Sequence, residues 1–494
     1  MMLSILIFLP LALALLIAFL PRSQTLVRTV ASAGSLVVLA VSVFVSIPIF
    51  RDGAGYTQAF PWIPTIGAEY SLRIDGISMP LILLTTLLTS IALFYSLYAH
   101  KLDLSKSLKE YVIFFLVMET GLLGVFLAAD LLLFYVFWEA ALVPLYFIIG
   151  IWGHENRRRA AFKFFLYTRA GSLALLLSIL ALYVRTQPHS FSMEAIRQAG
   201  QSAGTSTLAI WVLVGFVIGF GVKLPIVPLH SWLPDAHVEA PTAGSVILAG
   251  VMLKMGGYGL LRIMLPTMGA VIAKYWYVLA VIALVGVVYG AAVALAQQDF
   301  KRMIAFTSIN HMGFVLLGVT LASLSLSAQN REAAVDGAML QMISHGLLTG
   351  GMFVLVGIIQ TRAGTRDLNS LGGAWTRLPV YAAFLTAFAF GSFGLPSMSG
   401  FVAEFQVFVA TLSVSGWSAF VLAFGVAIST GLYLYALQRV LFGKPTAAIT
   451  EATDLNRIEI WSLAPMLALA FLIGLVPGLL IQSIQQAMPQ VLAK

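Results

Sequence analysis

The sequence contains no cysteine and few charged residues. The absence of cysteine in 494 residues excludes disulfide bonds, thiolate metal sites and cysteine-held iron–sulfur clusters on this chain. The seven histidines form no HxxH or HExxH motif, so we expect no histidine-based metal site. Charged residues make up 10% of the chain, far below the share of about 25% that is typical of soluble domains. Redox chemistry, if the protein takes part in any, must lie on another chain.

Apolar runs occupy most of the sequence and predict an all-α polytopic membrane protein. Hydrophobic residues make up 60% of the chain, and its mean hydropathy is +0.96. The first run has no basic residues before it and is one of many, so we interpret it as a spanning helix and not as a cleaved signal peptide. At about 20 residues per crossing, the sequence predicts fourteen crossings, at residues 2–20, 30–50, 77–99, 111–129, 131–151, 160–183, 208–229, 241–265, 273–297, 301–324, 336–360, 378–411, 417–442 and 460–488.

The chain is interpreted as a single membrane domain over residues 1–494, with N-terminal helices within residues 1–110. Pro61, Trp62 and Pro64 lie in the long second connection, which predicts an ordered extramembrane loop. Odd-numbered connections hold seventeen Lys and Arg residues, whereas the opposite side, counted with the C-terminus, holds seven. Because cytoplasmic loops carry an excess of basic residues, we expect both termini on the outer side of the membrane. The net charge of +8 needs no nucleic acid to explain it.

Four basic residues fall within predicted crossings: Arg169, Lys223, Lys254 and Arg262. A charge at the bilayer centre costs about 2.5–3.5 kcal/mol on insertion scales, so each needs an explanation. Lys254 follows Pro241 by thirteen residues, which places it about 20 Å along its helix and near the midplane. Arg262 is close to the helix end and is expected to reach the interface.

Two acids, Glu119 and Glu139, lie within apolar runs of the first half. One interpretation is a neutral, hydrogen-bonded carboxyl group that holds two helices together. The other is a proton carrier whose proton affinity is set by a lysine partner.

Two Leu-Pro dipeptides lie inside later crossings, one at Pro225, two residues after Lys223, and one at Pro396, eight residues before Glu404. Proline interrupts a helix, and a broken membrane helix is tolerated only inside protein or along a wet cavity. The two prolines are 171 residues apart, and the same offset from Glu139 leads to Asn310. These offsets predict two five-helix repeats, residues 111–265 and 273–442, each with a discontinuous helix, followed by a C-terminal helix in residues 460–494. Because each repeat has an odd number of crossings, the two must be inverted in the membrane.

Five stretches carry a family resemblance: "FYVFWEAALVPLYFIIGIWG", "GVKLPIVPLHSWLPDAHVEAPTAGSVILAGVMLKMGGYGLLR", "DFKRMIAFTSINHMGFVLLG", "QMISHGLLTGGMFVLVG" and "LPSMSGFVAEF". They resemble the antiporter-like subunit M (chain 4) of proton-pumping NADH:quinone oxidoreductase, the respiratory complex I or NDH-1 type. The likeness covers residues 130–408. The resemblance implies an integral protein of the bacterial cytoplasmic membrane, or an equivalent one, that contacts lipids and other membrane subunits, including adjacent antiporter-like ones. It implies no cofactor on this chain, with flavin, iron–sulfur clusters and quinone elsewhere in the parent complex.

The resemblance also assigns roles to residues. Glu139 and Lys223 match the ion pair at the input side of the family's channel, Lys254 its central lysine, and Glu404 its terminal acid. An acid at position 404 favours the complex I type over the related antiporter subunits, in which the matching position looks like a lysine. Arg169 departs from the pattern and is a candidate partner of Glu119 or Glu139. The histidines that match the family's connecting groups are His230, His237, His311 and His345.

The resemblance implies a subunit that moves a proton along a buried Glu, Lys, His and water axis when quinone is reduced elsewhere. For His230 and His237 the alternative role is to hold the proline-rich bend, and for His311 and His345 it is hydrogen bonding between helices. At the level of the whole chain, a subunit of a multisubunit sodium/proton antiporter and a stand-alone cation or solute transporter remain alternatives. A scaffold subunit without a pathway is disfavoured by the two buried lysines.

Overall fold

The fold is a bundle of membrane-length helices. The computed structural model describes residues 1–53, 55–99 and 108–492; Lys101, Lys106 and Lys494, which entered the charge count, lie outside this part. Twelve helices of the described chain are long and apolar enough to cross a membrane. They comprise α1 (Met2–Phe19), α2 (Gln24–Asp52), α3 (Met79–Phe94) with η2 (Tyr95–Ala99), α4 (Leu108–Leu127), α5 (Leu131–Ala140) with α6 (Leu142–Trp152), α7 (Arg157–Tyr183), the segment Thr242–Lys274, α14 (Trp276–Leu295), α15 (Phe300–Ala322), α16 (Ala328–Ala363), α20 (Gly416–Leu441) and α22 (Arg457–Leu475).

Two further crossings are each built from two shorter helices. The first consists of α9 (Thr207–Lys223) and α10 (Trp232–Glu239), and the second of α18 (Pro379–Ser392) and α19 (Ser399–Leu412). Pro225 and Pro396 lie in the two gaps, where a residue without an N–H cannot continue the helical hydrogen bonds. With these two, the number of crossings reaches the fourteen expected from the sequence.

The second connection, which the sequence predicts to be an ordered loop, forms a β-hairpin. Strands β1 (Tyr56–Ile63) and β2 (Ala68–Ile74) pair antiparallel, and Tyr56 lies opposite Ile74. Gly67 closes the turn with a φ of 63°, a conformation that favours glycine. The remaining short elements are η1 (Pro64–Ile66), α8 (Met193–Ala203), α17 (Ala374–Arg377), α21 (Ala447–Thr450), α23 (Gly478–Ala487) and η5 (Met488–Gln490).

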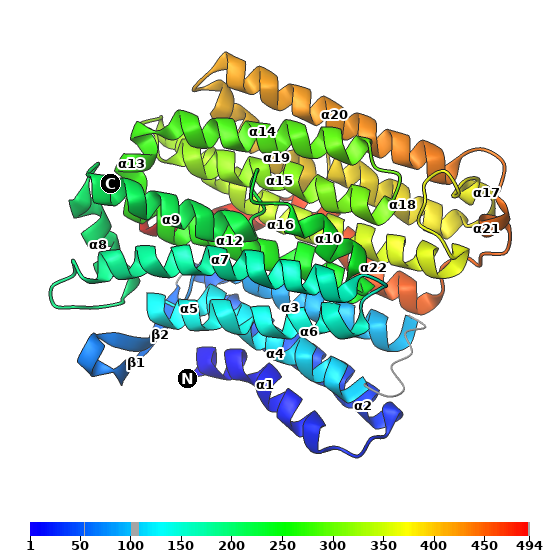
Figure 1. Ribbon diagram of the computed structural model, residues 1–494, viewed down its shortest axis with the longest axis horizontal. Coiled ribbons are helices and arrows are strands. Elements are labelled where there is room, and N and C mark those ends of the chain that lie inside the picture. Colours follow the sequence, from blue (N-terminus) through cyan, green and yellow to red (C-terminus); the bar gives the residue numbers. More distant parts are fainter. Residues whose placement is uncertain (54, 100–107, 493–494) are drawn as a thin grey trace.

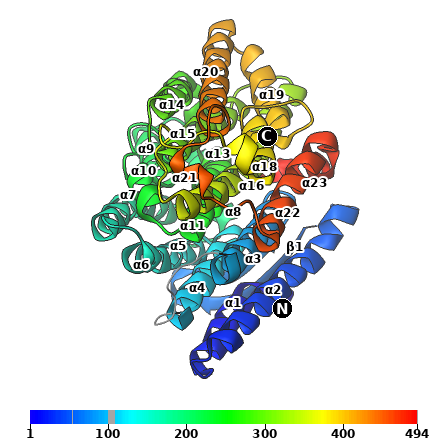
Figure 2. The ribbon, with the colours of Figure 1, turned by 90° about the vertical axis from the view of Figure 1, so that its right-hand side faces the viewer.

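The helices run side by side along the long axis of the molecule (Figure 1). The end-on view places α1 and α2 along one edge and α20 at the opposite edge, with α16 between them (Figure 2). The spans Thr242–Lys274, α15 and α16 are buried throughout their apolar windows, whereas those of α1, α2 and α22 are one-third buried. Both ends of the chain, the hairpin and α8 lie at the same end of the bundle (Figure 1).

A close helix contact fixes the buried span Thr242–Lys274 against the end of α9. A Cβ atom on Gly256 would lie 2.6 Å from both the Leu224 nitrogen and the Phe220 oxygen. Those are backbone atoms, which cannot turn away as a flexible side chain can. Glycine therefore allows the helix that carries Lys254 to approach the first break.

We predict that Gly256→Ala destabilises the protein by about 1–3 kcal/mol because the added methyl group overpacks this contact. Gly269→Ala is the matched control, since a Cβ at Gly269 meets nothing within 4 Å. Thermal unfolding of the purified protein in detergent measures both variants. Equal midpoints for Gly256→Ala and Gly269→Ala would contradict the prediction.

Candidate functional site

Lys254 lies in Thr242–Lys274, one of the three spans whose apolar windows are buried throughout. Its helix α12 (Leu253–Gly259) is flanked by the π-helical turns η3 (Leu248–Met252) and η4 (Leu260–Met264), with α11 (Thr242–Ile247) before and α13 (Leu265–Lys274) after them. π-helical turns are rare in proteins overall, and many of those that occur lie at functional sites. The Lys254 side chain is 0% exposed, donates to the Ala249 carbonyl and lies 2.6 Å from His345 Nδ1. The ammonium group is thus held by one carbonyl and one imidazole.

The contact with His345 continues through two more helices. The rings of His345 on α16 and His311 on α15 have centroids 5.5 Å apart, and His311 Nδ1 lies 3.5 Å from Glu404 Oε1 on α19. All four side chains are at least nine-tenths buried. We call Lys254, His345, His311 and Glu404 the central line. It joins a lysine to a carboxylate through two imidazoles, each of which can both accept and donate a proton.

Gln341 also belongs to this site and was missed in the sequence. Its Nε2 donates to His311 Nδ1 at 3.0 Å. Gln341 precedes His345 by four residues on α16, so both side chains lie on one helix face. That spacing is the signal that could have found it.

The other two histidines lie near the first break. His237 on α10 is fully buried and stacks on Phe353 with ring centroids 4.5 Å apart. Within the described chain, neither of its ring nitrogens has a hydrogen-bond partner. His230 lies in the break itself, and its Nε2 is 3.3 Å from the Tyr289 hydroxyl of α14.

The expected ion pair between Glu139 and Lys223 is not formed in this structure. Glu139 on α5 pairs with Arg169 on α7, one of the two partners considered for that arginine. Among the described residues no carboxylate lies within 4 Å of Lys223, whose Nζ sits 4.8 Å from the Trp138 ring centroid in a cation–π contact. A guanidinium group binds a carboxylate more strongly than an ammonium group does, which explains why Glu139 pairs with Arg169 and not with Lys223.

The Arg169–Glu139 pair lies on the outside of the bundle. The Arg169 side chain is 49% exposed, whereas that of Glu139 is 15% exposed. The second candidate partner of Arg169, Glu119 on α4, is fully buried, and neither of its carboxyl oxygens has a partner in the described part of the chain.

Two basic residues have partners that the sequence did not reveal. Arg262 is buried and forms an ion pair with Asp75 at 2.7 Å, and Arg73 lies 3.8 Å from the same carboxylate oxygen. Asp75 follows β2 and is held by the hairpin, a placement that hydropathy could not predict. Lys301, counted above among the residues of a connection, is buried in the first turn of α15, and its Nζ donates to the Ala240 carbonyl at 2.6 Å.

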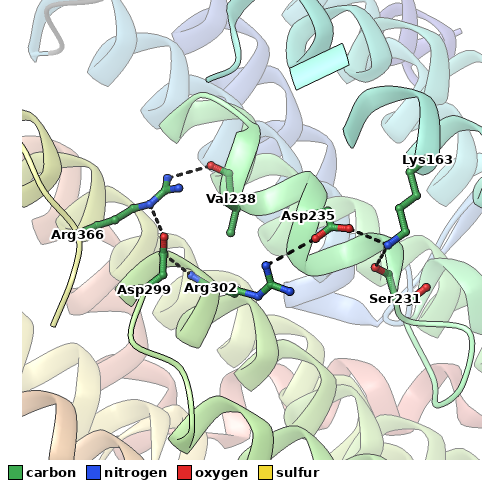
Figure 3. A network of polar contacts seen from close by, with 7 residues as sticks. All are labelled: Lys163, Ser231, Asp235, Val238, Asp299, Arg302 and Arg366. Carbon is green, nitrogen blue, oxygen red and sulfur yellow. Dashed lines mark hydrogen bonds and ion pairs between the residues drawn. The ribbon is translucent and has the colours of Figure 1, made fainter. Parts of the chain in front are cut away.

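A polar network fastens α10, the second half of the first broken crossing, to its surroundings (Figure 3). Lys163 of α7 donates to Asp235 Oδ2 at 2.7 Å and to the Ser231 carbonyl at 2.8 Å. Arg302 of α15 lies 3.8 Å from the other Asp235 oxygen. From the segment after α16, Arg366 donates to the Val238 carbonyl at 3.0 Å and to Asp299 Oδ2 at 2.5 Å. We call these contacts the α10 clamp.

No group of three or more His, Cys, Asp or Glu residues in the described part of the chain could hold a metal ion. The site instead offers titratable side chains in contact, or near contact, across four helices. Such an arrangement can pass protons along the central line without a change of any covalent bond other than N–H and O–H bonds.

Comparisons with known proteins agree on one family. Residues 128–429 match the family model described as NADH:quinone oxidoreductase/Mrp antiporter, TM. The chain is 38% identical over 502 residues to the NADH-quinone oxidoreductase subunit M of Rickettsia felis, covering 99% of this chain and 98% of the relative. It is 37% identical to the F(420)H(2) dehydrogenase subunit M of Methanosarcina mazei, covering 96% and 94%. A chain of the Thermus thermophilus respiratory complex I with bound NADH superposes with a TM-score of 0.86 at 28% identity, with full coverage of both chains.

We predict that Arg169 and Glu139 are energetically coupled. Arg169→Gln and Glu139→Gln each leave one charge unpaired within a membrane crossing, so each should lower the thermal stability of the protein. The double variant removes both charges and should be more stable than the sum of the two single effects implies, by about 0.5–3 kcal/mol. Thermal unfolding of the four proteins forms the test cycle, and strictly additive effects would show that the pair is not coupled.

Proposed function

This chain belongs to the family of M subunits of NADH-quinone oxidoreductase, and we propose that it is a proton-translocating membrane subunit of such a complex. The parent complex oxidises NADH or an equivalent donor and reduces quinone, and this chain moves a proton across the membrane in response. The observation that carries the proposal is the central line, in which Lys254, His345, His311 and Glu404 follow one another through the middle of the bundle.

The central line has the chemistry that a proton path needs. A lysine buried without a carboxylate partner can release its proton, whereas an arginine stays charged. Neutral imidazoles accept a proton on one nitrogen and give up another from the other nitrogen. Several buried polar atoms along the site have no protein partner in the described chain, among them His345 Nε2 and both nitrogens of His237. Buried polar groups of this kind are ordinarily hydrogen-bonded to water, which would complete the path.

Glu139, Lys223 and Arg169 supply the control at the input side. When Glu139 faces Lys223, the carboxylate stabilises the ammonium form. When Glu139 pairs with Arg169, as it does here, it stabilises the ammonium form of Lys223 less, which favours transfer of the proton towards Lys254. Quinone chemistry in the parent complex would drive the exchange of Glu139 between its two cationic partners. Glu119, a fully buried acid of the same half, would modulate this charge, and His230, in the break after Lys223, would help to connect the input side to the central line.

The two five-helix repeats, residues 111–265 and 273–442, are part of the proposal. An aspartate caps the second crossing of each: Asp130 caps α5 and Asp299 caps α15. Each aspartate also forms an isolated antiparallel bridge to the segment after the third crossing, Asp130 with Ser192 and Asp299 with Asp367. The helices α4 and α14, which open the repeats, run in opposite directions along the bundle (Figure 1). These matches support an inverted repeat whose two broken helices lie on either side of Lys254.

The setting follows from the family. We propose a bacterial cytoplasmic membrane or an equivalent one, with both termini on the outer side, as the imbalance of seventeen against seven basic residues indicates. Flavin, iron–sulfur clusters and quinone belong to other parts of the complex. The half-exposed Arg169 lies where a neighbouring membrane subunit, such as another antiporter-like one, would cover it.

The proposal predicts that Lys254→Ala separates electron transfer from proton pumping. The complex should assemble and transfer electrons from NADH, or a replacement donor, to quinone, but pump fewer protons per electron, because the central line loses its lysine. Proton uptake by membrane vesicles during donor oxidation measures the ratio. Lys274→Ala, which removes an exposed lysine of α13, is the control. Full pumping by Lys254→Ala would refute the proposal.

The second candidate is a subunit of a multisubunit sodium/proton antiporter, which the matching family model also covers. The two functions differ in the ion that they need. We expect pumping to be the same in sodium-free and sodium-containing buffer, because three of the four groups of the central line are nitrogen bases, which do not bind sodium. A pumping rate that rises with sodium concentration would favour the antiporter.

A further inference from the structure

Lys301 is a third buried lysine of the bundle that the path described above does not use. It lies in the first turn of α15 and is 1% exposed. α15 begins at the end of the bundle opposite to the chain termini (Figure 1). The α10 clamp lies beside it (Figure 3), and the Asp235 side chain of the clamp is 36% exposed. Lys301 thus lies at the start of a helix, near one end of the bundle, and its side chain is nevertheless buried.

The contacts of Lys301 explain how its charge is tolerated. Three successive carbonyls at the C-terminal end of α10 accept hydrogen bonds: Val238 from Arg366, Glu239 from the His154 N–H, and Ala240 from Lys301. A helix C-terminus carries partial negative charge and attracts cations. Asp299, two residues before Lys301, forms an ion pair with Arg366 beside it.

Capping alone does not require a lysine. A neutral donor such as a glutamine amide would satisfy the Ala240 carbonyl without the cost of burying a charge in a membrane protein. A buried ionisable group in this setting is by default a candidate for function.

The inner side of Lys301 leads to the central line. His237 precedes Ala240, the residue that Lys301 caps, by three residues, and Ser245 of the span that carries Lys254 donates to the His237 carbonyl at 3.1 Å. Its two ring nitrogens are fully buried and have no partner in the described part of the chain. His237 thus belongs to the segment that Lys301 binds and contacts the span of Lys254, with both nitrogens open to a neighbour or to an intervening water.

We propose that Lys301 is the group through which the central line takes up protons from the clamp end of the bundle. The ammonium group of Lys301 gives one proton to a ring nitrogen of His237, directly or through water. The ring releases the proton of its other nitrogen to the neutral amine of Lys254. The amine of Lys301 then takes a proton from the aqueous side. A turn of the His237 ring brings its N–H back to the first position, and Lys254 becomes neutral again when it passes its proton along the central line. Each cycle thus moves one proton inwards. The inference rests on the proposed function and adds an entrance to it.

The test replaces Lys301 by glutamine, which keeps a donor for Ala240 but cannot carry a proton. We expect Lys301→Gln to assemble and to transfer electrons, with protons pumped per electron lowered to the level of Lys254→Ala. Arg302→Gln is the matched control, because it removes one positive charge from the same helical turn and leaves Asp235 bound to Lys163; it should pump normally. Vesicle pumping, electron-transfer rate and subunit content are measured for all three variants.

The outcomes are distinguishable. Full pumping by Lys301→Gln with poor pumping by Lys254→Ala overturns the inference alone, whereas full pumping by both overturns the proposed function. An equal loss in Arg302→Gln overturns the inference in favour of a general charge effect. Lys301→Arg keeps the charge and the cap, but arginine does not release its proton, so it should pump poorly; normal pumping overturns the inference. A complex that assembles with neither Lys301 variant assigns the lysine a structural role and also overturns it.

Discussion

The cost of placing an ammonium group in the middle of a membrane protein is the constraint on which this structure depends. Hydrogen bonds to one carbonyl and one imidazole offset this cost for Lys254, and no carboxylate of the described chain pairs with the lysine. Such support holds the group in place without fixing it in the charged form, which a close ion pair would do. The span that carries it is buried along its whole length, and two π-helical turns flank the lysine. The lipid-facing helices thus enclose a site whose charge can change.

The two broken crossings serve the same purpose from opposite sides. A helix that ends inside the bundle brings an end and a non-helical segment to the depth where a polar group needs partners. At the first break, α10 is secured by cations from α7, α15 and the segment after α16. At the second, α19 presents Glu404 to His311. The segments 111–265 and 273–442 each contain a capping aspartate with an isolated β-bridge. Their broken crossings carry opposite charges, a lysine in the first and a carboxylate in the second.

Much of this could be predicted from sequence, because hydropathy and proline are local signals. The fourteen crossings, the positions of the two interruptions and the members of the central line all follow from runs, dipeptides and family motifs. The partners of charged groups could be predicted only in part, because they depend on which faces of distant helices meet. Glu139 binds Arg169, one of two candidates for that arginine, and not Lys223, whereas the pair of Arg262 with Asp75 had no signal in the sequence. Lys301 was counted among the residues of a connection because the start of a helix resembles a connection in sequence. In the structure this first turn of α15 is buried.

The half-exposed guanidinium of Arg169 also bears on how such a chain is made. Arg169 lies twelve residues into α7, about 18 Å along a helix whose outward face is otherwise apolar. A lone copy of the chain in a bilayer would set this group and its carboxylate against acyl chains, and the lipid would have to thin or admit water around them. Newly inserted copies would therefore be least stable before a neighbour joins them, which makes the orphaned polypeptide a natural substrate for membrane quality control.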